Sequence, residues 1–162
     1  MMIKPRPFEG DKIRVSLNIT NTVEKWMPVS LEEACEKWYD DPVQFVRDNF
    51  GVEPDAWQVD ALNAYMNNQC LAMKACKGPG KTTVLAWIGW HYLCTRPAPK
   101  IAAISVSKDN LRDGLWTEMA KWQHESEFLT NQFEWTAKRI YHKKYSKHWF
   151  MSARSYSKTA DK

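Results

Sequence analysis

The 162-residue sequence has no apolar run approaching the roughly 18 residues that a membrane-spanning helix needs. Its opening residues, MMIKPRPFEGD, also lack the apolar centre of a secretory signal peptide. We therefore expect a protein without a membrane segment that works in the cytoplasm. At this length a chain can bury a sizeable core as one globular unit.

Paired cysteines are missing as well. Cys35, Cys70, Cys76 and Cys94 form no C-x-x-C pair, and no histidine stands at the spacing of a zinc site. This pattern favours four reduced thiols over a zinc site or a disulfide framework.

Charge is unevenly distributed, although the net charge is only +4. Residues 138–162 carry eight Lys and Arg and one Asp, a net of +7, which leaves −3 for the rest of the chain. Tyr141 and Tyr145 are interleaved with the basic residues of the segment 138–147. The asymmetry indicates contact with a nucleic-acid backbone or with acidic neighbouring segments, and a solvated basic hairpin is an equal alternative.

The first part of the sequence predicts an arm followed by short helices. Residues 1–41 are expected to form an N-terminal arm and helix, in which residues 12–19 alternate like a strand and Ser30 opens the helix. A helix over residues 42–50 follows, with Pro at its first position, and Asp55 caps a third helix that ends near residue 67.

From residue 70 onward, apolar runs and helical periods alternate, which predicts an α/β fold. The predicted elements are strand 70–75, helix 81–95, strand 100–107, helix 109–124, and extended segments 134–141 and 148–155 around a basic turn.

Between the first of these strands and its helix lies A-C-K-G-P-G-K-T, which fits the Walker A pattern except that its first glycine is Ala75. A polyphosphate needs many donors in a small concave space, and Gly78 and Gly80 allow the backbone to turn its N–H groups inward. The loop leads into a helix N-terminus, whose dipole favours anions. The residues expected to hold the phosphates of ATP are Cys76, Lys77, Gly78, Pro79, Gly80, Lys81, Thr82 and Thr83.

Several of these side chains have predicted roles in the chemistry. Lys81 is expected to reach the β- and γ-phosphates, Thr82 to ligate Mg²⁺, and Thr83 to bond an α-phosphate oxygen. Lys77 would stand beside the γ-phosphate and stabilise the transition state as an arginine finger does. The alternatives are a solvated Lys77 and a Gly-Pro-Gly turn that merely starts a helix.

Upstream of the loop, Trp57 and Gln58 lie at the start of a predicted helix. A Gln amide both donates and accepts, as reading the adenine edge requires, and Trp57 offers an apolar wall. In the competing interpretation, Gln58 completes a capping box with Asp55, three residues earlier.

Taken together, these motifs resemble the ATPase region of large terminase subunits, the DNA-packaging motors of tailed bacteriophages. Residues 53–58 resemble an adenine-reading Q motif, and residues 74–83 resemble the variant Walker A motif with its internal basic residue. Residues 101–122 are similar to the next strand and helix, and residues 149–155 to a later strand. The resemblance covers about residues 42–162.

The resemblance implies a P-loop NTPase of the RecA-like, additional-strand (ASCE) type with three α/β/α layers, and ATP and Mg²⁺ as ligands. It implies an ATPase that moves double-stranded DNA into a procapsid in the bacterial cytoplasm, as a homo-oligomeric ring, usually a pentamer. The portal protein and the small terminase subunit are its implied partners. By the same comparison Lys81 and Thr82 bind phosphate and metal, Lys77 is the basic residue of the loop, and Trp57 and Gln58 contact adenine.

The sequence departs from the family where a Walker B carboxylate and a catalytic Glu should end another buried strand, because nothing after Ser155 has that form. Asp109 is the remaining candidate, and its position favours a helix cap. The coupling segment and nuclease domain are also absent. We expect residues 42–162 to be the N-terminal portion of the ATPase domain, incomplete at its C-terminus, with an exposed strand edge. A helicase-like DNA-remodelling ATPase and a non-hydrolysing nucleotide-binding or assembly fragment are the alternatives.

Overall fold

The structure, a computed structural model, describes residues 31–156 and has a mixed α/β fold. The predicted strand at residues 12–19 and the Ser30 cap lie outside these residues. In chain order the elements are α1 (Leu31–Tyr39), α2 (Pro42–Phe50), α3 (Ala56–Asn67), α4 (Lys81–Thr95), β1 (Lys100–Ser105), α5 (Lys108–Leu111), the π-helical segment η1 (Arg112–Trp116), α6 (Thr117–Glu125), α7 (Glu127–Gln132), β2 (Phe133–Trp135), β3 (Arg139–His142) and β4 (Phe150–Ser155).

The local signals for α2 give the helix its predicted bounds. Asp41 Oδ1 accepts a hydrogen bond from the Gln44 N–H at 2.8 Å, and Pro42 occupies the first helical position. At the other end Gly51 adopts φ 63° and donates its N–H to the Arg47 carbonyl at 3.0 Å. A left-handed residue ends a helix there, and glycine adopts this conformation without steric cost.

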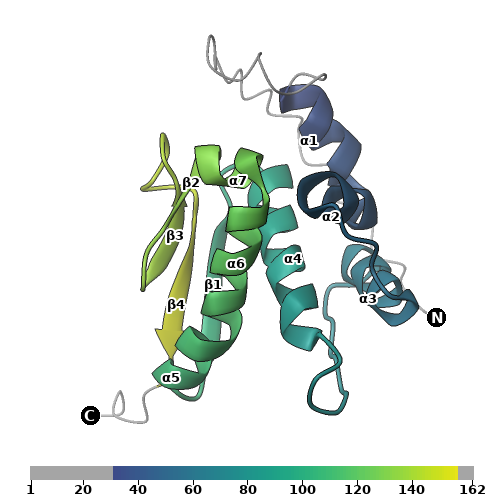
Figure 1. The fold of residues 1–162 in the computed structure, drawn as a ribbon. Coiled ribbons are helices and arrows are strands. Elements are labelled where there is room, and N and C mark those ends of the chain that lie inside the picture. Colours follow the sequence, from purple (N-terminus) through teal and green to yellow (C-terminus); the bar gives the residue numbers. More distant parts are fainter. Residues whose placement is uncertain (1–30, 157–162) are drawn as a thin grey trace, which may run out of the picture.

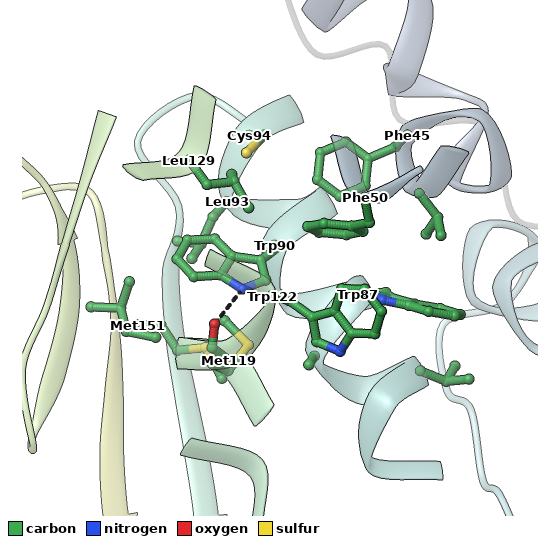
Figure 2. Close-up of a cluster of buried hydrophobic side chains, with 14 of the residues drawn as sticks. Phe45, Phe50, Trp87, Trp90, Leu93, Cys94, Met119, Trp122, Leu129 and Met151 are labelled. Atoms are coloured by element: carbon green, nitrogen blue, oxygen red, sulfur yellow. Dashed lines mark hydrogen bonds between the residues drawn. The ribbon is translucent and has the colours of Figure 1, made fainter. Parts of the chain in front are cut away.

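Helix α4 also has its predicted bounds and lies at the centre of the core. Helices α1, α2 and α3 pack on one side of it, and α6 and the sheet lie on the other side (Figure 1). Trp90 is fully buried and donates its Nε1–H to the Met119 carbonyl at 3.1 Å, as Figure 2 shows. The rings of Trp87 and Trp122 meet with centroids 5.2 Å apart. Burying several aromatic side chains at one place supplies much of the apolar area that stabilises the fold.

The four strands form one mixed sheet in the order β1-β4-β3-β2. Strand β1 is parallel to β4, whereas the other two pairings are antiparallel. Ala103, Ile140 and Met151 are buried on the face that the helices cover, while Ile104 on the opposite face is 67% exposed. Within residues 31–156 the helices therefore cover one face of the sheet, where the resemblance implied helices on both.

Residues 70–75 do not form the predicted buried strand. They are an irregular segment between α3 and the loop, and Leu71 within it is 36% exposed. A strand needs a neighbour to satisfy its N–H and C=O groups, and the described sheet ends at β1, which pairs only with β4. The apolar composition of this segment does not by itself supply a pairing partner.

The predicted helix at residues 109–124 is present as the continuous series α5, η1 and α6. Its cap is Ser107, whose Oγ accepts from the Asn110 N–H at 3.1 Å, so strand β1 ends earlier than predicted. The interpretation of Asp109 as the cap is wrong. Its exposed carboxylate lies in the first turn, 3.2 Å from Arg112 Nη1.

The predicted extended segment 134–141 is two strands separated by a turn. The Thr136 N–H donates to the Arg139 carbonyl at 2.8 Å, and this contact closes the turn between β2 and β3. Strand β4 follows the basic turn as predicted, although it begins at Phe150.

Candidate phosphate-binding site

The segment of residues 75–80 is an irregular loop immediately before α4. It lies at the end of the molecule toward which the parallel strands β1 and β4 run (Figure 1). Ligands of α/β proteins commonly bind outside the carboxyl ends of parallel strands. The predicted phosphate loop is therefore at a position suited to a ligand.

The loop owes its curvature to two glycines in the left-handed region, Gly78 at φ 98° and Gly80 at φ 91°. Residues with a Cβ atom rarely adopt this conformation. Among residues 31–156 there is no acceptor for the backbone N–H groups of Lys77, Gly78 and Gly80. Together with the first turn of α4, these groups are available to an anion.

The side chain of Lys81 bridges the base of the loop. Its Nζ donates to the Ala75 carbonyl at 2.9 Å and also to the Cys76 carbonyl. An ammonium group carries three N–H donors, so one remains for a ligand while the other two hold the loop in its curled shape. The charge of Lys81 thus lies at the base of the loop.

The two threonines after Lys81 point to different surroundings. Thr82 is exposed in the first turn of α4, where its hydroxyl is accessible to a metal ion. Thr83 is half-buried and donates its Oγ1–H to Glu118 Oε1 on α6 at 2.7 Å. Sequence reasoning missed Glu118, because 35 residues separate the two and no local pattern joins them.

Helix α3 begins beside the loop. A Cβ atom built on Gly80 would lie 3.0 Å from Gln58 Nε2 and 3.8 Å from Trp57 Cζ2. The capping interpretation of Gln58 is confirmed, since its Oε1 accepts from the Asp55 N–H at 2.8 Å. The other end of the amide, Nε2, faces the loop.

Two further predicted site residues, Cys76 and Lys77, are exposed on the loop, and Pro79 is half-buried. Lys77 makes no hydrogen bond or ion pair with any residue in the described range. Its predicted role beside the γ-phosphate stays a prediction.

The basic turn between β3 and β4 lies at the opposite end of the sheet from the phosphate loop (Figure 1). Lys143 Nζ donates to the Thr130 carbonyl at 2.8 Å, whereas Lys144 and Lys147 are exposed. Tyr145 and Trp149 are stacked with centroids 6.3 Å apart, so this tyrosine supports the turn.

His142, at the start of the same turn, stacks on Trp149 with centroids 4.7 Å apart and also contacts Tyr145 at 5.2 Å. Burial lowers the pKa of His142, and the neighbouring charge of Lys144 lowers it further. The basic character of this turn therefore comes from its lysines.

Among residues 31–156, no three His, Cys, Asp or Glu side chains gather closely enough to bind a metal ion by themselves. None of the helices in this range has the length and apolar character to cross a bilayer. Comparisons with models of known protein families, with curated proteins and with solved structures found no match.

Proposed function

We propose that the chain is the nucleotide-binding portion of an ATP-driven DNA-packaging motor of the terminase large-subunit type. In this proposal its fold is the N-terminal portion of a RecA-like P-loop NTPase domain. The observation that carries the proposal is the loop before α4, where two left-handed glycines, unbonded amide N–H groups and the Lys81 ammonium meet at a helix N-terminus.

The loop residues divide the work of holding a triphosphate. The amide groups of Gly78 and Gly80 and the ammonium of Lys81 bind phosphate oxygens and orient them, which is the larger part of catalysis in phosphoryl transfer. Thr82 holds Mg²⁺, which would neutralise charge on the β- and γ-phosphates. Lys77 turns toward the γ-phosphate, and Trp57 and Gln58 contact adenine.

The partners follow from the resemblance. They are double-stranded DNA, the portal protein and the small terminase subunit, and the working form is a ring of about five copies in the bacterial cytoplasm. A motor must move along any sequence, so contact with the phosphate backbone suits it better than contact with base edges. The exposed Lys144 and Lys147 support this part of the proposal.

The direct test is calorimetric titration of the full chain with a non-hydrolysable ATP analogue and Mg²⁺. Lys81→Ala should weaken binding about 10- to 100-fold, since a charge-assisted bond to phosphate is removed. Lys100→Ala removes the same charge from an exposed position at the other end of β1 and should bind normally.

Circular dichroism of Lys81→Ala should match the wild-type spectrum, because the residue lies at a surface loop. Equal affinity of the wild-type and Lys81→Ala proteins, or no binding by either, would remove the phosphate-loop assignment.

A further inference from the structure

Glu118 joins the first turn of α4 to α6. Its Oε1 accepts hydrogen bonds from Thr83 Oγ1 at 2.7 Å and from Trp122 Nε1 at 2.8 Å. The side chain of Glu118 is 21% exposed, and Lys121 Nζ lies 3.7 Å from the same oxygen. A half-buried carboxylate thus accepts two side-chain donors immediately behind the phosphate loop.

The hydroxyl of Thr83 has only one proton to donate. An ionised phosphate oxygen is purely an acceptor, as is the carboxylate of Glu118. Thr83 can therefore donate to one of the two anions at a time, and it donates to Glu118 in this structure.

We propose that Glu118 is a positioning residue that competes with the nucleotide for the hydroxyl of Thr83 and so links occupancy of the loop to α6. This inference rests on the proposed nucleotide binding. When phosphate enters, Thr83 rotates toward it and keeps its proton, while Glu118 retains Trp122 and Lys121. Glu118 then no longer accepts a hydrogen bond from Thr83, and the indole of Trp122 remains as its side-chain hydrogen-bond donor.

Trp122 connects the Glu118 carboxylate to the aromatic side chains of the core. The ring of Trp122 packs against Trp87 at 5.2 Å and against Phe50 at 4.9 Å between centroids. A shift of the Glu118 carboxylate that moves Trp122 on α6 therefore changes the contacts of Trp122 with Phe50 on α2 and Trp87 on α4.

Glu118→Gln tests the competition directly. The amide has nearly the same size and still accepts from Trp122, but it is a weaker acceptor for Thr83 and carries no negative charge. The variant should bind the ATP analogue with Mg²⁺ about three- to tenfold more tightly than the wild-type chain. Glu125→Gln, an exposed change of the same charge on α6, should bind as the wild type does.

A second measurement follows the indole N–H signal of Trp122 in the full chain by ¹H–¹⁵N NMR, assigned with Trp122→Phe. In the wild type the signal should move as the ATP analogue saturates the site. Thr83→Val should reduce this movement to the size seen for the other indoles, and Thr83→Ser, which keeps the hydroxyl, should restore it.

The outcomes separate the two levels of the proposal. If the wild-type chain binds the analogue but Glu118→Gln binds no tighter, or the Trp122 signal stays in place, the role of Glu118 is wrong and nucleotide binding stands. If the wild type does not bind the analogue at all, both fall.

Discussion

The amide nitrogen of Gln58 lies so close to Gly80 that a Cβ atom at this glycine would come within 3.0 Å of it. The oxygen of the same amide accepts from the Asp55 N–H at the start of α3. Gln58 is buried and cannot turn away without breaking that bond. The phosphate loop and the beginning of α3 are therefore fitted to each other.

We predict that Gly80→Ala destabilises the protein by about 2–4 kcal/mol, because a left-handed alanine costs about 1–2 kcal/mol and the contact with Gln58 adds to it. Gly78→Ala is a matched control, since Gly78 has a similar φ of 98° and nothing within 4 Å of an added Cβ. Its cost should be the backbone strain alone. Urea unfolding of both variants measures the difference.

The contact itself can be isolated in a second background. Gly80→Ala should cost less in a chain that also carries Gln58→Ala, since the amide that it would meet is gone. Equal costs for the two glycine variants, or the same cost with and without Gln58, would show that the loop does not press against α3.

Stability should also depend on His91, which is fully buried and makes two hydrogen bonds. Its Nε2 donates to the Trp38 carbonyl at 2.7 Å, and its Nδ1 accepts from the Tyr65 hydroxyl at 3.2 Å. Burial lowers the pKa of His91 to about 4, and the charge of Arg96 lowers it too. The hydrogen bond to Trp38 and the negative charges of Asp41 and Asp40 raise the pKa and offset part of this effect.

In the unfolded chain, His91 takes up a proton near its ordinary pKa of 6.5. The contribution of neutral His91 to the free energy of unfolding is therefore complete above pH 6.5, and it is lost as the pH falls toward 4. We expect His91 to account for a loss of about 2 kcal/mol between about pH 7.5 and pH 5. Urea unfolding at both pH values measures it.

The matched variants are His91→Gln and His124→Gln, the second on the exposed side of α6. His91→Gln should be less stable at neutral pH and should lose most of the difference between the two pH values. His124→Gln should keep the wild-type difference. A wild-type pH dependence in His91→Gln would contradict the assignment to this residue.

A separate prediction concerns binding of duplex DNA by the basic turn between β3 and β4. Lys143 is engaged with the Thr130 carbonyl, so the exposed Lys144 and Lys147 are the side chains to remove. The double change to Ala should weaken binding to duplex DNA and lower the slope of log K against log salt by about 2, one for each phosphate that a lysine no longer neutralises.

Its control is Lys74→Ala with Lys108→Ala, an equal loss of charge from the segment before the phosphate loop and from the start of α5. The control should keep the wild-type salt slope, and the Lys144 and Lys147 variant should keep its affinity for the ATP analogue. An unchanged slope in the turn variant would leave the turn as a solvated hairpin.

The sequence was sufficient to predict helix ends and the loop, because the hydrogen bonds and backbone angles that define them involve residues close together in the chain. Asp41 with Pro42, and Gly51 after Phe50, mark both ends of α2, because caps involve residues within one turn of each other. The capping bond of Gln58 could be foreseen for the same reason. The Gly-Pro-Gly spacing likewise predicted a curled loop before α4, since only glycine adopts its backbone angles freely.

Contacts between distant residues could not be foreseen in this way. Glu118 lies in a helix that was predicted, yet its bond to Thr83 depends on how α4 and α6 pack. Similarly, the proximity of Gln58 to Gly80 follows from the placement of α3 beside the loop, for which the capping pattern gives no information.

The amino-acid sequence by itself determined most of the helices and the curled glycine loop, because a helical turn or a left-handed glycine needs only its near neighbours, although the short helix α7 was not predicted. The tertiary structure decided which apolar segments became strands: residues 70–75 remain outside the sheet, whereas β1 pairs with β4 across about 50 residues of chain. Strand hydrogen bonds join segments that are far apart in the chain, so an extended segment becomes a strand only when folding brings a partner alongside it.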